Sequence, residues 1–168
     1  MKMKTIKVQE LSRKAFRQYG TYQNLLDNED LAEASMRKAG FFADLLTLNF
    51  GTSTLPSVSV CHVKQEEKSI IPMVENHKYT CEGLLPLDSD VIMFFGRVVN
   101  GEMSLDTIEA FNIPRGTFVK VEPLILHGRQ FVTKAAEAHV LCLLPQRTFN
   151  NDINKKILGD DEKIEILV

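Results

Sequence analysis

Val91-Ile-Met-Phe-Phe-Gly-Arg-Val-Val-Asn-Gly-Glu-Met-Ser-Leu-Asp-Thr-Ile-Glu-Ala-Phe-Asn-Ile113 is the stretch of sequence that decides the fold. Both of its halves are rich in β-branched and aromatic residues, which favour strands. Asn100-Gly101 lies between the halves, and both residue types tolerate the positive φ angles that a tight hairpin turn requires. The sequence therefore predicts a strand at 91–98 joined through this turn to a strand at 107–113.

The same pattern continues on both sides of the predicted hairpin. Short apolar runs recur along the chain, separated by turns that contain Pro, Gly, Asn and Asp. Many short strands without intervening helices are typical of an antiparallel barrel or sandwich, whereas βαβ units alternate strands with helices. We therefore expect a mainly β protein. The further predicted strands are 5–10, 41–50, 58–63, 75–85, 117–121 and 139–144.

Two short helices are predicted near the N-terminus. The first begins at Ser12, a suitable N-cap residue, and ends at Gly20. The second spans Asn28 to Ala39, and Gly40 ends it.

Length and charge restrict the class of protein. The 168 residues are the size of one domain, and we expect a single domain over 1–168. The tail 150–168 ends in the alternating Lys163-Ile-Glu-Ile-Leu-Val168, which suits an edge strand or a dimer contact. A net charge of -2 provides no electrostatic footprint for nucleic acid or an anionic membrane. Since no transmembrane or signal segment is recognisable, we expect a cytoplasmic protein.

The three cysteines are Cys61, Cys81 and Cys142, and no C-x-x-C pair occurs among them. All three lie in or beside apolar strand patterns, so buried reduced thiols are expected. Cys81 precedes Glu82 and is the cysteine that we expect to be able to face a pocket. A structural zinc site is not expected.

A polar cluster is predicted from Glu75-Asn-His77-Lys-Tyr-Thr-Cys-Glu82, Pro114-Arg-Gly116 and the later His127. Side chains alternate along a strand, so Glu75 and His77 point to the same face. Glu82 rejoins them if residues 78–81 form a turn or bulge, and His127 enters from another strand. An imidazole and a carboxylate in one pocket are sufficient for acid–base catalysis. The alternative interpretation is an exposed strand face before a turn.

The spacing Glu-x-His-x4-Glu, followed by Pro-x-Gly and a downstream His, resembles the two motifs of the cupin superfamily, His-x-His-x(3,4)-Glu and Pro-x-Gly-x-x-His. Within that superfamily the chain is most similar to the ureidoglycolate lyase family. The residues that carry this similarity are Ile6-Lys-Val-Gln-Glu-Leu-Ser-Arg-Lys-Ala-Phe-Arg-Gln-Tyr-Gly20, Glu75-Asn-His77, Leu85-Pro86, Ile108-Glu-Ala-Phe111 and His127. The resemblance implies a cupin-like double-stranded β-helix, or antiparallel barrel, with the site in its mouth.

The resemblance also implies an activity and a set of roles. A ureidoglycolate lyase eliminates urea from ureidoglycolate, and a relative would act on a similar small hydroxy or keto acid. On this basis we expect His77 and His127 to transfer protons, and Glu82 or Glu75 to orient them. Lys120 is the preferred contact for the substrate carboxylate. Other cations available for that contact are Lys78, Arg97 and Arg129. A homodimer is expected from the family.

The chain departs from the pattern of metal-binding cupins at two positions. Glu75 stands where the first histidine of the first motif is expected, and Val119 stands where the second motif has its histidine. No cofactor is predicted for this reason, although a divalent metal would have Glu75, His77, Glu82 and His127 as its ligands. The alternative functions are a metal-dependent cupin, of the isomerase or dioxygenase type, and a noncatalytic domain that binds a small ligand.

Overall fold

The computed structural model describes residues 3–35, 40–52 and 54–168. Within these ranges the chain consists mainly of strands, with three short helices. In chain order the elements are β1 (Lys4–Glu10), α1 (Arg13–Phe16), β2 (Gly20–Asn24), α2 (Asn28–Ala34), β3 (Pro56–Lys64), β4 (Ser69–Ile71), β5 (Met73–Asn76), β6 (Glu82–Pro86), β7 (Val91–Val99), β8 (Glu102–Ile113), β9 (Thr117–Val121), β10 (Glu137–Pro145), α3 (Thr148–Asn151), β11 (Asn154–Ile157) and β12 (Ile164–Leu167).

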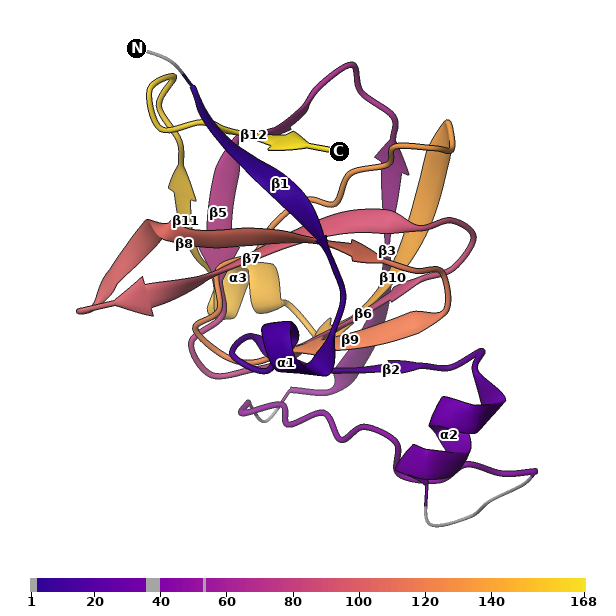
Figure 1. Cartoon of the computed structure of the whole chain (residues 1–168). Coiled ribbons are helices and arrows are strands. Elements are labelled where there is room, and N and C mark those ends of the chain that lie inside the picture. The colour runs from indigo at the N-terminus through magenta and orange to yellow at the C-terminus, as the bar shows by residue number, and fades with distance from the viewer. Residues whose placement is uncertain (1–2, 36–39, 53) are drawn as a thin grey trace.

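The strands form two five-stranded sheets that curl around a common interior (Figure 1). The strand orders are β4-β12-β1-β8-β7 and β2-β9-β6-β10-β3, and β5 pairs separately with β11. Residues 126–131 connect β7 to β5 through isolated bridges, which pair Leu126 with Gly96, Phe131 with Ile92, and His127 with Glu75. This curled arrangement confirms the prediction of a mainly β fold with short helices.

The main core lies between the two sheets. It joins buried side chains of β7 and β8 to those of β6, β9 and β10. Phe16 of α1 packs edge-to-face on Phe95 of β7, with ring centroids 5.0 Å apart. A second cluster, on the opposite face of β7, contains Phe94 and Ile164. Because β7 is buried on both faces, it reads as a continuous apolar run rather than an alternating one.

The hairpin predicted at Asn100-Gly101 is present. These two residues have φ angles of 52° and 83°, and β7 pairs antiparallel with β8 from Val91–Ile113 to Val99–Glu102. β8 starts earlier than predicted, at Glu102, because a two-residue turn leaves no unpaired residues before the second strand.

Several predicted boundaries were wrong. Residues 41–50 do not form a strand: Phe50 makes an isolated bridge to Thr80, and the rest of the segment has no neighbouring strand to pair with. The first helix is a single turn, because Gly20 begins β2 instead of ending a helix. The second helix ends at Ala34, and the remainder of its predicted span, 36–39, lies outside the described residues. The predicted strand 75–85 is interrupted by the loop 77–81.

The C-terminal segment was predicted as an edge strand, and for β12 this is wrong. β12 lies between β1, to which it is parallel, and β4, to which it is antiparallel. Its residues Ile164 and Ile166 are buried in the second cluster, so these apolar side chains pack in the interior of this chain. β11, by contrast, has a single partner strand, β5.

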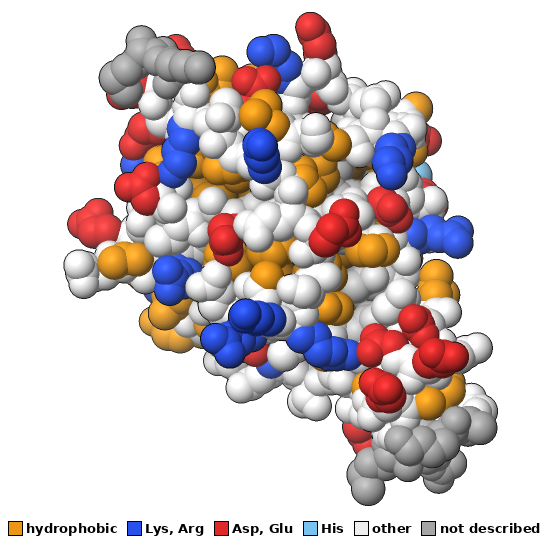
Figure 2. All heavy atoms as spheres, viewed as in Figure 1, with side chains coloured by type: hydrophobic (Ala, Val, Ile, Leu, Met, Phe, Trp, Pro, Cys, Tyr) orange, Lys and Arg blue, Asp and Glu red, His pale blue; other side chains and the backbone are white. Residues whose placement is uncertain are grey.

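The surface visible in Figure 2 carries acidic and basic side chains interspersed with each other. This mixture agrees with the small net charge of -2. Among the described residues, no helix has the length and apolar character needed to cross a membrane.

Candidate metal centre

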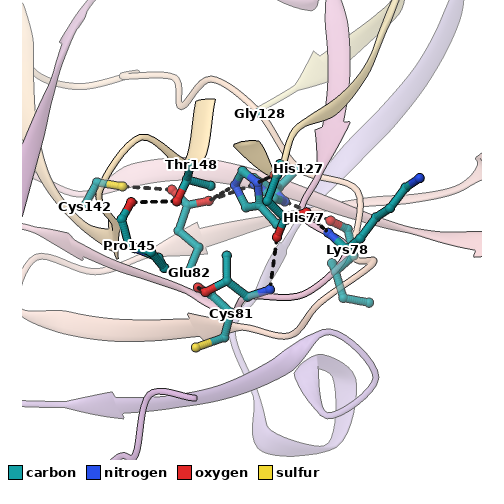
Figure 3. Close-up of polar contacts among 12 residues, drawn as sticks. His77, Lys78, Cys81, Glu82, His127, Gly128, Cys142, Pro145 and Thr148 are labelled. Carbon is teal, nitrogen blue, oxygen red and sulfur yellow. Dashed lines mark hydrogen bonds and ion pairs between the residues drawn. The ribbon is translucent and has the colours of Figure 1, made fainter. Parts of the chain in front are cut away.

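Three side chains from different parts of the chain converge between the sheets (Figure 3). His77 comes from the loop after β5, Glu82 begins β6, and His127 comes from the segment that bridges β5. Oε2 of Glu82 lies 2.8 Å from Nε2 of His127 and 3.4 Å from Nε2 of His77. All three side chains are buried. The loop 77–81 thus brings Glu82 back beside the histidines, which is the condition that the sequence analysis set for a shared site.

Backbone carbonyl groups fix the orientation of both imidazole rings. Nδ1 of His77 donates a hydrogen bond to the carbonyl oxygen of Asp152 at 2.6 Å, and Nδ1 of His127 donates to that of Ile125 at 2.8 Å. A carbonyl oxygen carries no proton, so Nδ1 must be the donor in each case. When the rings are neutral, both Nε2 lone pairs therefore point toward Glu82.

The three facing atoms have no hydrogen-bond partner. Nε2 of His77, Nε2 of His127 and Oε2 of Glu82 are all buried and unsatisfied. Although the contact between His127 and Glu82 is short, the two groups are not aligned as a hydrogen bond. Three buried acceptor atoms around one point are costly unless a cation lies among them, either a proton or a metal ion.

The electrostatics of the site reflect this need for a cation. Burial by itself would raise the pKa of Glu82, but the facing His127 and the contacts with His77 and Cys142 outweigh burial and lower that pKa well below its usual range. Burial would likewise lower the pKa of His127, but the charge of Glu82 raises it above its ordinary value. The site therefore favours a carboxylate next to positive charge.

The donor set suits a divalent metal ion. Each of the three residues offers one ligand atom, and these atoms all lie within 4.8 Å of one another. Two histidines and one carboxylate are a familiar ligand set for divalent transition metals. Hydrogen bonds from the other ring nitrogen to backbone carbonyls are also usual for metal-binding histidines. Glu75, which the sequence placed in the ligand set, is not part of this cluster.

Val119 occupies the position where the second cupin motif has its histidine. Its side chain is fully buried in the main core, so this strand contributes packing rather than a ligand. The second histidine of the site is His127, six residues beyond the end of β9 at Val121.

Asp152 builds the loop that carries His77, and sequence reasoning did not find it. Its carboxylate accepts hydrogen bonds from the backbone N–H groups of Lys78, Tyr79 and Thr80, at 2.8, 3.0 and 3.2 Å. Its own carbonyl oxygen accepts from His77. One buried residue at the end of α3 therefore shapes the loop and orients the ring.

A cavity of about 240 Å³ opens beside the cluster, between β3 and residues 127–130. Glu82, His127 and Cys142 contribute to its wall, as does Glu75. Glu75 pairs directly with His127, and opposed residues of an antiparallel pair lie on the same face. Glu75 therefore lies in the wall of the cavity, beside the cluster rather than in it.

The cations that line the cavity are not those that were preferred from the sequence. Lys64 and Arg129 line it, and Arg129 forms an ion pair of 2.5 Å with Glu66. Arg129 was among the cations considered, whereas Lys64 was missed. Lys64 is the last residue of β3.

The sequence predicted that Lys78, Arg97 and Lys120 contact the substrate. The structure corrects this prediction, because none of the three lines the cavity. Lys120 lies between Val119 and Val121, which face the core, so its side chain points to the outer face, where it pairs with Glu122 at 2.7 Å. Lys78 is exposed and points away from the histidines in Figure 3. Arg97 is exposed on β7, beyond the bulge.

The three cysteines are free thiols, and Cys81 and Cys142 are buried as predicted, whereas Cys61 is only partly buried and the orientation of Cys81 differs from the expectation. Cys81 points away from the cluster (Figure 3), because Glu82, its neighbour on the chain, points inward. Cys61 and Cys142 line the cavity instead. Sγ of Cys142 donates a hydrogen bond to Oε1 of Glu82 at 2.9 Å. Burial and the adjacent Glu82 raise the pKa of the Cys142 thiol, so the group stays protonated.

The chain was compared with protein-family models, curated proteins and solved structures. No protein-family model matches the chain, and no curated protein matches it. Among solved structures, the chain is similar to an oxalate decarboxylase mutant of Bacillus subtilis, with 13% identity, a TM-score of 0.43, and coverage of 63% of this chain and 24% of that one. The chain thus spans about a quarter of that protein.

A second solved structure is a dTDP sugar isomerase from Desulfovibrio desulfuricans, with 9% identity, a TM-score of 0.45, and coverage of 66% of this chain and 68% of that one. A third is RmlC from Streptococcus suis, solved with dTDP-D-xylose, with 9% identity, a TM-score of 0.38, and coverage of 54% and 44%. The functional conclusion rests on the residues of the site.

Proposed function

We propose that this protein is a metal-dependent enzyme of the cupin type that acts on a small molecule. His77, Glu82 and His127 are the ligands of one divalent metal ion. The observation that carries the proposal is the convergence of three buried ligand atoms within 4.8 Å, each without a hydrogen-bond partner. The other ring nitrogen of each histidine, Nδ1, donates a hydrogen bond to a backbone carbonyl oxygen, which fixes the orientation of the ring.

The surrounding residues support a catalytic rather than a purely structural site. When bound, a divalent ion supplies Lewis acidity that polarises a substrate oxygen. Glu75 lines the adjacent cavity and is available there to accept or donate a proton. Lys64 and Arg129 line the same cavity as Glu75 and Glu82, so the cavity offers charges of both signs to a polar substrate. The cavity has room for a small molecule beside the ligands.

Metal retention by histidine variants tests the ligand set. We expect the wild-type protein to retain one divalent metal per chain after gel filtration, and His77→Ala and His127→Ala to lose it while circular dichroism shows an intact β fold. His139→Ala is the matched control, because this histidine is half-exposed and pairs with Asp88 away from the cluster. Equal retention by all four proteins would refute the ligand set.

A second candidate function is the metal-free lyase reaction implied by the resemblance to ureidoglycolate lyases. The close pairing of His127 with Glu82 supports it, because an imidazole held next to a carboxylate is suited to proton transfer. Release of glyoxylate from ureidoglycolate in the presence of a chelator would favour this reaction. If the protein neither retains metal nor releases glyoxylate, the noncatalytic ligand-binding alternative is the one left.

We also propose a homodimer. Among the strands of the described residues, β3 pairs with β10 alone, and Val58 and Val60 are exposed on it. An unpaired edge with exposed apolar residues is a site where a second strand can add. Light scattering should therefore give twice the chain mass of 19.0 kDa. A particle with the mass of one chain would contradict the dimer.

A further inference from the structure

The side chain that contacts the far oxygen of Glu82 is Cys142, from β10. Cys142 pairs with Leu84 across β10 and β6, and Glu82 precedes Leu84 by two residues on the same face. This register places Sγ of Cys142 2.9 Å from Oε1 of Glu82 (Figure 3). Both side chains are buried. A thiolate and a carboxylate would repel at this distance, so the thiol proton must lie between them.

The two oxygens of Glu82 consequently have different surroundings. Oε1 accepts the hydrogen bond from Cys142, whereas Oε2 faces His77 and His127. Without the thiol, the carboxylate could rotate about its last carbon–carbon bond and turn either oxygen, or both, toward the histidines. The hydrogen bond removes this freedom.

We propose that Cys142 is a positioning residue that holds Oε1 of Glu82, so that a single carboxylate oxygen faces the two histidines. For metal binding, which rests on the proposed function, Oε2 would be the oxygen of Glu82 that holds the ion, while Cys142 retains Oε1.

A thiol suits this task in an interior of this kind. Cys142 belongs to the main apolar core, packed with residues of β6, β9 and β10. A hydroxyl in its place would seek an acceptor and a donor, whereas a thiol behaves as a small hydrophobe with one weak donor. The residue can therefore satisfy the carboxylate without leaving a polar atom unpaired.

The hydrogen bond can be measured in the metal-free protein through the S–H stretching band in the infrared. The difference spectrum between wild type and Cys142→Ser isolates the band of Cys142 from those of Cys61 and Cys81. We expect this band at a lower frequency than that of a free thiol, and a shift to higher frequency in Glu82→Gln, because an amide oxygen is a weaker acceptor than a carboxylate. A Cys142 band at the free-thiol frequency would overturn the proposal.

The effect on the ligand can be measured with Co²⁺ as the probe. Cys142→Ala should weaken Co²⁺ binding by about 10- to 100-fold and change the visible spectrum, as loss of an outer hydrogen bond to a ligand commonly does. Cys142→Ser retains a donor and should restore most of the affinity. Cys81→Ala is the matched control, because it truncates a buried thiol that points away from the cluster, and it should bind Co²⁺ like the wild type.

Two results with Co²⁺ would overturn the positioning role. One is unchanged affinity and spectrum in Cys142→Ala. The other is an intense thiolate-to-cobalt band in the wild type that is lost in Cys142→Ala, because Cys142 would then be a ligand itself. If the wild type binds none of Mn²⁺, Co²⁺ and Zn²⁺, the proposed function fails; if it fails to bind Co²⁺ alone, the infrared band decides whether Cys142 holds Glu82. The infrared result also decides the case if Cys142→Ala does not fold.

Discussion

Glu82 is the residue on which the site depends, since its buried carboxylate contacts both histidines and a thiol. A charged group in the interior persists only when its partners compensate for the lost hydration. Here one oxygen is satisfied by Cys142, and the other has no hydrogen bond. A metal ion bound there would satisfy this second oxygen and the Nε2 atoms of both histidines.

Replacing single carboxylates separates the ligand from its neighbour in the cavity. Glu82→Gln should weaken divalent metal binding by more than about 100-fold, because it removes the only negative charge within the ligand cluster of the described residues. Glu75→Gln should retain the metal and lower turnover by roughly 10² to 10⁴ if Glu75 transfers a proton. Calorimetric titration with Mn²⁺ measures the first effect. Equal metal affinity in both variants would contradict the division of roles.

At the scale of elements, the loop 77–81 depends on a residue at the end of α3. Asp152 lies 75 positions after His77 in the sequence. No pattern within the loop indicates this contact, and a short polar segment near the C-terminus is equally typical of a surface turn. Long-range hydrogen bonds of this kind form only in the folded chain. The sequence therefore predicted the turn, but it did not predict that Asp152 holds it.

Asp152→Ala should destabilise the protein and weaken metal binding together. Three buried or half-buried N–H groups lose a charged acceptor, which corresponds to about 2–4 kcal/mol of unfolding free energy. Urea unfolding gives this value, and Asp152→Asn, which retains an acceptor oxygen, should recover part of it. Thr148→Ala is a control on α3, because its hydroxyl bonds to Pro145 rather than to the loop. If Asp152→Ala binds metal as tightly as the wild type, the loop does not need this clamp to place His77.

Strand alternation held information about the site that the sequence prediction did not use. Thr117, Val119 and Val121 are all buried, and this period of two places Lys120 on the outer face. The same period in β10 buries Val140, Cys142 and Leu144. Alternation would therefore have removed Lys120 from the substrate contacts, whereas the continuous apolar run Val140 to Leu144 does not show from the sequence which face carries Cys142. The hairpin at Asn100-Gly101 was predictable because its signal is local.

At the scale of the whole molecule, the N-terminal segment ties the two sheets together. β1 pairs with β8 in one sheet, and β2 pairs with β9 in the other. Between them, the hydroxyl of the buried Tyr19 donates a hydrogen bond of 2.6 Å to Glu109 on β8. Burial, followed by the contact with Glu109, raises the pKa of Tyr19 well above its ordinary value of 10.0.

This raised pKa predicts sensitivity to alkaline pH. Below pH 10 both the folded and the unfolded chain hold the Tyr19 proton, so the contribution to stability is complete. Above pH 10 the unfolded chain loses that proton more readily than the folded chain, so unfolding becomes easier as pH rises. Tyr19→Phe should lose about 1–2 kcal/mol at pH 7 and lack this part of the alkaline decline. Urea unfolding at several pH values would contradict the account if both proteins declined in parallel.

The metal content of the wild-type protein tests the central claim most directly. The metal-free chain would be incubated with Mn²⁺, Co²⁺ or Zn²⁺, passed through gel filtration, and analysed by elemental mass spectrometry against protein concentration. The geometry of His77, Glu82 and His127 predicts about one ion per chain for at least one of these metals. Metal at the level of the buffer alone, for every ion tested and with the protein folded, would contradict the claim that this cluster is a metal centre.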